Sequence, residues 1–202
     1  AVSPNVAAKT VTLDRVSAVA GLSVESSSTG RYNAMGLVLT NTSKESHSVV
    51  IGAGMYFSAT ESRYQNLAAV EEKTVRLEAG AVMNVQVQTA CMDPARGVAP
   101  ARYARWSPRQ DRGLAPLLLF LDASVALLAP FVGGEHLSTP EKRRSFKQAV
   151  IWVYYDASKD RMVSFASGHM FGGDRVAASA FIDAVHPAAS MAIQIYKQSQ
   201  GG

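Results

Sequence analysis

The hydrophobic period changes once along this chain, and that change restricts the possible folds more than any other feature of the sequence. Between residues 8 and 90, apolar side chains recur at every second position or in short runs, most regularly in MNVQVQ at 83–88. This alternation is typical of antiparallel strands that bury one face and expose the other. Beyond residue 114 the apolar positions follow a helical period, as Leu117, Leu121 and Val125 do.

The order of the two halves predicts an α+β fold built as a single domain over residues 1–202. We expect an antiparallel β-sandwich at about 8–90, an arginine-rich loop at 91–113, and a mainly helical part at 114–198. Three or more helices should pack on or beside the sandwich, because no linker composition separates the two halves.

Helix-start signals define the best-supported helix, which is predicted at about 140–156. Ser138 or Thr139 can cap it, Pro140 suits its first turn, and Glu141 completes a capping box. An earlier helix should cover 115–129. Two later helices are predicted at about 174–185, after Asp174 as the cap, and at about 187–198, beginning at Pro187.

Composition excludes several classes of protein. A chain of 202 residues with 48% apolar and 18% charged residues is large enough to bury a core without disulfide or metal crosslinks. Its single cysteine excludes an intramolecular disulfide and a cysteine-rich zinc site. The four histidines, His47, His136, His169 and His186, show no metal-ligand spacing, and GxSxG and HExxH motifs are absent. We therefore expect no metal, no cofactor and no enzymatic activity.

The start AVSPNVAAKT resembles the mature end left by signal-peptide cleavage, although removal of an initiator Met before Ala would leave the same end. We expect a secreted, periplasmic or cell-surface protein. The longest apolar run, residues 114–134, is interrupted by Asp122 and bracketed by Pro116 and Pro130, whereas a span needs about 20 apolar residues. This pattern predicts a buried helix and no membrane span.

The loop at 91–113 concentrates positive charge around an aromatic side chain, in a chain with a net charge of +4. Its candidate residues for partner or anion binding are Arg96, Arg102, Arg105, Trp106, Arg109 and Arg112. A glycan, a lipid headgroup or a protein would be a suitable partner. No nucleic-acid recognition motif accompanies the arginines, so we expect no nucleic-acid partner, and a solvated connector is the simpler interpretation.

Two short motifs have structural interpretations that we prefer to functional ones. The stretch VVIGAGMYF at 49–57 resembles a dinucleotide-binding turn, but Phe57 stands where the third glycine is needed. We read it as a turn between strands. Asn41-Thr42-Ser43 fits the N-glycosylation sequon, and it also has the composition of a hairpin turn.

The lone cysteine, Cys91, lies in QTACMDPARG, where a strand-like stretch meets the arginine-rich loop. A reactive cysteine needs a cation, a histidine or a helix N-terminus nearby, whereas here Asp93 is closer in sequence than Arg96. A small buried hydrophobic residue is the commonest role for such a cysteine. Both interpretations remain open from the residues alone.

Downstream of Cys91, the predicted helix carries Gln148-Ala149-Val150-Ile151-Trp152. A cysteine late in a β-rich region, followed by a Gln-x-x-apolar-Trp helix, resembles the thioester domains of Gram-positive bacterial surface proteins. The resemblance implies that Cys91 is the thiol and Gln148 the acyl donor of an internal thioester that attaches covalently to an amine. Trp152 would pack one turn further along the same helix face.

These observations predict an exported, non-enzymatic β-sandwich module that acts in cell-surface adhesion or as a subunit of an extracellular assembly, with or without a Cys91–Gln148 thioester. Its expected partner is a protein, a second copy of itself, or a cell-surface amine or glycan. The N-terminal segment would be able to donate a strand to a neighbour. The alternative is a periplasmic or extracellular ligand-binding protein or enzyme, with a site assembled from scattered residues such as Glu135, His169 and Asp174.

Overall fold

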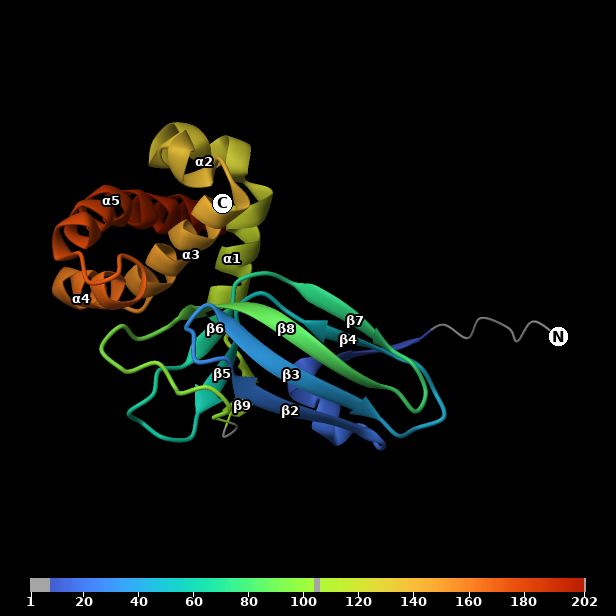
Figure 1. Ribbon diagram of the computed structural model, residues 1–202. Helices are drawn as coiled ribbons and strands as arrows, with labels where there is room; N and C mark the ends of the chain where they lie inside the picture. The colour runs from blue at the N-terminus through green and yellow to red at the C-terminus, as the bar shows by residue number, and fades with distance from the viewer. Residues whose placement is uncertain (1–7, 104–105, 202) are drawn as a thin grey trace.

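The computed structural model describes residues 8–103 and 106–201, and within them it confirms the predicted α+β fold. The strands form two sheets, and the helices gather at one end of them (Figure 1). The proposed strand donation by the N-terminal segment concerns residues that lie mainly outside the described part of the chain.

The smaller sheet has three strands in the order β1-β4-β7. They are β1 (Lys9–Thr12), β4 (His47–Ile51) and β7 (Lys73–Leu77). β4 pairs antiparallel with β7 but parallel with β1, which departs from the expected antiparallel arrangement. The long connection from β1 to β4, through a short 3-10 helix (η1, Leu13–Ala18) and two strands of the other sheet, permits this parallel pair.

The larger sheet is antiparallel at each of its pairs, in the order β2-β3-β8-β6-β5-β9. Its strands in chain order are β2 (Leu22–Ser28), β3 (Ala34–Asn41), β5 (Met55–Ala59), β6 (Leu67–Ala69), β8 (Val82–Cys91) and β9 (Trp106–Gln110). β8 is long enough to pair with β3 along its first part and with β6 at its end. Cys91 is therefore held at a central position of the sheet.

β9 corrects the prediction that residues 91–113 form a loop throughout. It pairs with β5 at the edge of the larger sheet, where Pro108 is tolerated because an edge strand leaves some N–H positions unpaired. Trp106 begins β9 and is only 8% exposed, packed in the core between the sheets. That core includes Leu37, Leu39 and Ile51, which are 1%, 0% and 0% exposed.

The helical part contains five α-helices and a second 3-10 helix among the described residues. They are α1 (Leu114–Ala123), α2 (Val125–Val132), η2 (Gly134–Leu137), α3 (Pro140–Tyr154), α4 (Lys159–His169) and α5 (Arg175–Gln200). The helix expected at 115–129 is instead two helices bent by 91°. α4 was not predicted, because its Ser167-Gly168-His169 end resembles a loop in sequence.

α5 corrects a second helix prediction, because the helices expected at 174–185 and 187–198 are one continuous helix that contains Pro187. Ile182, Val185 and Ala189 lie on its buried face and pack into the helical core. By length and hydropathy α5 is able to cross a membrane, as is the bent pair α1 and α2 if taken together. The expectation of no membrane span therefore stays a prediction.

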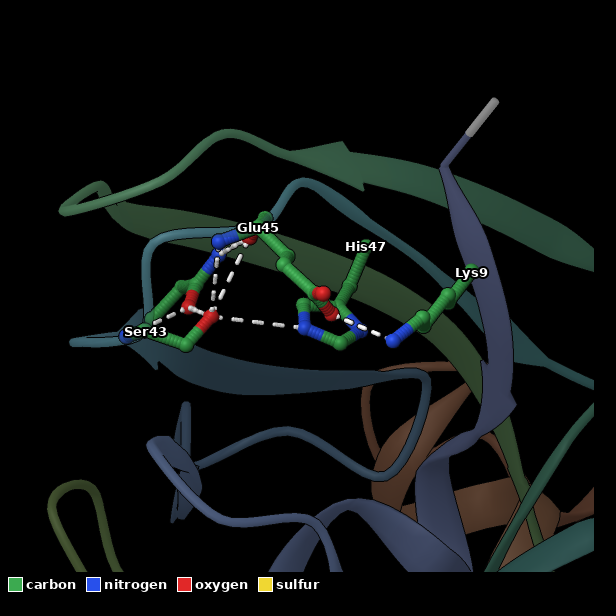
Figure 2. A network of polar contacts seen from close by, with 5 residues as sticks. Lys9, Ser43, Glu45 and His47 are labelled. Atoms are coloured by element: carbon green, nitrogen blue, oxygen red, sulfur yellow. Dashed lines mark hydrogen bonds and ion pairs between the residues drawn. The ribbon is translucent and has the colours of Figure 1, made fainter. Parts of the chain in front are cut away.

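The turn between β3 and β4 is built from side-chain hydrogen bonds (Figure 2). Asn41 is fully buried, and its Nδ2 donates to the carbonyl oxygen of Glu45 over 2.8 Å. The sequon therefore lies in a hydrogen-bonded connection between strands, but this connection is not the expected hairpin turn, because β3 and β4 belong to different sheets. Ser43 Oγ lies 3.4 Å from His47 Nε2 but donates over 2.7 Å to Asn41 Oδ1. The Ser43 hydroxyl is therefore part of the hydrogen-bond network of this connection. Lys9 pairs with Glu45 at 2.6 Å and ties β1 to the same turn.

The glycines of the stretch 49–57 also serve structure. Gly54 has a φ of 78°, and a Cβ atom added there would lie 2.5 Å from the Cα atom of Ala115 in α1. Only glycine allows this approach between the sheet and the first helix. The turn between β4 and β5 therefore packs directly against α1. This agrees with our interpretation of residues 49–57 as a turn between strands, and not as the start of a dinucleotide-binding site.

Candidate functional site

Cys91 and Gln148 lie in contact although they are 57 positions apart in the sequence. The backbone N–H of Cys91 donates to Gln148 Oε1 over 2.7 Å, and Gln148 Nε2 donates to the Cys91 carbonyl oxygen over 2.7 Å. Cys91 is 0% exposed and Gln148 is 3% exposed. The carboxamide is therefore fixed against the backbone of the cysteine at a buried site.

The start of α3 determines where Gln148 lies. Thr139 caps the helix by accepting the backbone N–H of Lys142 at 3.2 Å, and Pro140 occupies the first turn, as the sequence predicts. The predicted capping box of Ser138 with Glu141 does not form, because the cap is Thr139 and the Ser138 hydroxyl donates to the carbonyl oxygen of Glu135. Since residues four apart share a helix face, Gln148 and Trp152 both face the sheet. Trp152 is 0% exposed and belongs to the same hydrophobic cluster as Cys91.

A buried cation fixes α3 against its neighbours beside Gln148. Lys147 is only 3% exposed, and its Nζ donates to the carbonyl oxygen of Val70 over 2.6 Å. The same ammonium pairs with Asp122 of α1 at 2.7 Å. These contacts satisfy the buried charge and restrict movement of the turn of α3 that carries Gln148.

Two N–H groups approach the sulfur of Cys91, the indole of Trp152 and the backbone of Asp93. Trp152 Nε1 is buried and makes no hydrogen bond with the described part of the chain, but it lies close enough to the sulfur to lower the pKa of the thiol. Burial raises the pKa of the Cys91 thiol to about 12, and the two N–H groups offset only part of that rise. A free Cys91 is therefore protonated at neutral pH.

Aromatic side chains from three segments surround this contact. Phe165 of α4 packs edge-on against Trp152, with ring centroids 5.5 Å apart, and against Tyr32, at 5.2 Å. His169 lies 4.4 Å from Phe165 and 6.3 Å from Tyr32 between ring centroids. Tyr32, in the turn between β2 and β3, is close enough to Cys91 for a charge on the sulfur to raise the pKa of its phenol.

A cavity of about 200 Å³ opens beside Gln148. Tyr32 and Gln148 both line it, together with the polar side chains of Asn33 and Ser145. Arg144 also lines this cavity and pairs with Glu141 at 3.1 Å and with Glu71 at 3.7 Å. Gln148 thus forms part of the wall of a cavity, while its carboxamide is held by the backbone of Cys91.

A second cavity, of about 330 Å³, is lined by residues that directly follow Cys91. Met92 and Asp93 belong to its wall, as does Arg96, which pairs with Asp93 at 3.0 Å. Tyr155 lines it as well, and its hydroxyl donates to the Asp111 carboxylate at 2.5 Å. Asp93 and Arg96 of this cavity therefore satisfy each other.

The other arginine-rich candidates lie away from this contact. Trp106 is part of the core, where its Nε1 donates to the Tyr103 carbonyl oxygen over 2.9 Å. Arg102 is exposed, with a φ of 67°, while Arg109 and Arg112 are also exposed. Arg105 lies outside the described residues. Arg96 lines the cavity that Met92 and Asp93 also line, directly after Cys91 in the sequence.

The scattered residues of the alternative enzyme site have local roles. Asp174 accepts the backbone N–H of Ala177 over 2.9 Å and caps α5. Glu135 lies in η2 with its carboxylate 3.7 Å from His136, and His169 ends α4 against Phe165. Within residues 8–103 and 106–201, no group of three or more His, Cys, Asp or Glu is arranged to hold a metal ion.

Comparison with protein-family models, with curated proteins and with solved structures finds no match to this chain. The resemblance to thioester domains therefore stays a prediction from Cys91, Gln148 and Trp152. The contact among these residues is what the structure adds to it.

Sequence reasoning missed Tyr32, Phe165 and the backbone N–H of Asp93. Phe165 belongs to the helix that was not predicted, and Tyr32 follows a turn far from Cys91 in the sequence. A backbone N–H carries no sequence signal, and no motif marks Tyr32. Only the fold brings these groups beside Cys91.

Proposed function

We propose that this protein is a covalent-attachment module in which Cys91 and Gln148 form an internal thioester that acylates an amine on a partner. The observation that carries this proposal is the pair of 2.7 Å hydrogen bonds between the Gln148 carboxamide and the Cys91 backbone at a buried site. The carboxamide is held against the backbone of the residue that carries the thiol, and such proximity greatly accelerates intramolecular reactions.

The bond would form by attack of the Cys91 sulfur on Cδ of Gln148. The C–N bond of the carboxamide breaks, and the nitrogen leaves as ammonia together with the thiol proton. Negative charge develops on Oε1 during this step, and the Cys91 N–H already donates to that oxygen at 2.7 Å. A donor placed in advance at a developing oxyanion lowers the barrier to acyl transfer.

Burial would then preserve the thioester until an amine arrives. Cys91 and Gln148 are 0% and 3% exposed, so bulk water has little access to the acyl carbon. The cavity of about 200 Å³ provides an entry route for a primary amine to Gln148. Attack by the amine yields an amide on Gln148 and returns the sulfur to a buried thiol.

The protein would thus act once per molecule rather than turn over, which suits a surface or assembly protein better than an enzyme. We propose an exported module that attaches to a lysine-bearing or other amine-bearing partner, in adhesion or in an extracellular assembly. The same hydrogen bonds would also hold the end of β8 against α3 as a purely structural clamp, without any reaction. A chemical test therefore decides between the two roles.

Amine incorporation tests the proposal. The folded protein would be incubated with a biotin-linked primary alkylamine and no other enzyme, then digested and analysed by peptide mass spectrometry. We expect the amine at Gln148, and no incorporation in Cys91→Ala or Gln148→Ala. Gln194→Ala, which removes an exposed glutamine of α5, is the matched control and should label as the wild type does. Absence of labelling at Gln148 in the wild-type protein would reject covalent attachment.

A further inference from the structure

We propose that Tyr32 is the proton relay of this site, passing a proton from the attacking amine to the Cys91 sulfur as the thioester opens. The inference rests on the proposed thioester and adds a residue that no sequence motif marks. Its basis is the position of Tyr32, which lines the cavity beside Gln148 and packs against the hydrophobic cluster that contains Cys91.

The ring of Tyr32 is held in place by its neighbours. Phe165 contacts it edge-on at 5.2 Å between centroids and contacts Trp152 at 5.5 Å, so a single side chain braces both rings. The Tyr32 carbonyl oxygen also accepts the Thr89 hydroxyl over 2.9 Å, which ties the turn to β8 close to Cys91. The phenol is therefore a fixed part of the cavity wall.

The sulfur needs a proton donor when it leaves. In this environment the thiol pKa is raised to about 12, so expulsion of a bare thiolate is unfavourable despite the N–H groups of Trp152 and Asp93. Burial and the charge on Cys91 raise the pKa of Tyr32, which keeps the phenol protonated at neutral pH and able to donate. His169 is the other titratable ring near Tyr32, 6.3 Å away between centroids.

The proposed step balances without any other reactant. The amine nitrogen bonds to Cδ of Gln148, and the C–S bond breaks with its electron pair on sulfur. The Tyr32 hydroxyl gives its proton to the sulfur, and the new N–C unit gives a proton to the Tyr32 oxygen. The products are an amide at Gln148 and a neutral thiol at Cys91, with Tyr32 unchanged.

The test is the rate of thioester opening by methylamine in Tyr32→Phe, which keeps the ring and removes only the hydroxyl. We expect the variant to form the thioester, shown by loss of one ammonia in its intact mass, and to react about a hundredfold more slowly. In heavy water the wild-type reaction should slow and the variant reaction should not change. Tyr32→His, which restores a proton donor, should recover part of the rate.

Tyr64→Phe removes a hydroxyl from a tyrosine that packs on Tyr103 in the β part, and it should react at the wild-type rate. Equal rates for Tyr32→Phe and wild type would overturn the relay and leave the thioester intact. A Tyr32→Phe protein that folds but forms no thioester would also overturn it, because the hydroxyl would then act in bond formation. A wild-type protein with no thioester would overturn both the relay and the proposed function.

Discussion

At the scale of single residues, burial determines what Cys91 can do. A cysteine that reacts with molecules in solution needs an accessible thiolate, and this one is 0% exposed with a thiol pKa raised to about 12. Reaction with a neighbouring group held in contact needs no access from solvent, although the sulfur still has to give up its proton during the attack. Gln148 is such a group, which is why the same burial that makes the thiol inert to solution reagents favours an internal bond.

The pH dependence of stability distinguishes a free thiol from a thioester. A free Cys91 would keep its proton in the folded state up to pH about 12, whereas the unfolded thiol loses its proton above an ordinary pKa of 9.0. The free energy of unfolding would then fall as pH rises through that window, by about 1.4 kcal/mol per pH unit. A thioester carries no proton and adds no such slope.

The measurement is the difference in melting temperature between wild type and Cys91→Ala at about pH 8 and about pH 10. Other groups that titrate in this range and lie away from Cys91 contribute to both proteins and cancel. We expect a difference that does not change with pH. If the melting temperature of the wild type falls relative to that of Cys91→Ala as pH rises, the thiol is free.

At the scale of elements, α3 determines the geometry of the site, because it carries both Gln148 and Trp152. Its start is fixed by the Thr139 cap and its middle by the ion pair of Lys147 with Asp122. The side chain of Lys147 is 4% exposed and that of Asp122 is 44% exposed. A buried ammonium that loses its partner is costly, whereas exposed ion pairs contribute little.

Asp122→Ala should therefore lower the free energy of unfolding by about 2 kcal/mol, a value reduced from the fully buried case because Asp122 is half exposed. Asp183→Ala removes the partner of Lys159, whose side chain is 51% exposed, and should cost less than about 1 kcal/mol. Urea unfolding of both variants gives the comparison. Equal losses would mean that Lys147 does not anchor α3.

The elements also show where sequence patterns were sufficient and where they were not. The cap of α3 is a local signal, and the helix begins at Pro140 as expected. β9 was not predicted, because its five residues, which include Pro108 and an arginine, show little alternation of apolar and polar side chains. These residues form a strand because they pair with β5. Pro187 lacks a backbone N–H, and from sequence we therefore predicted a helix boundary there. α5 nevertheless continues through Pro187, because packing of its buried face compensates for the missing hydrogen bond.

At the scale of the whole molecule, the candidate site lies where the two halves meet. One hydrophobic cluster fills the space between the sheets, and another joins the helices to Ala68, Ala90 and Cys91 of the larger sheet. The sequence was sufficient to pair Cys91 with Gln148 through a family resemblance. The cavity, Tyr32 and the N–H groups at the sulfur depend on how the halves pack, which no local pattern encodes.

The central claim is that Cys91 and Gln148 are joined, and the intact mass of the folded protein, before and after methylamine, tests it most directly. We predict a mass lower than the sequence mass by one ammonia, no thiol available to alkylation after unfolding under mildly acidic conditions, and a gain of one methylamine on treatment. A mass equal to the sequence mass, with one thiol that alkylates after unfolding, would contradict the thioester and assign Gln148 the role of a structural clamp.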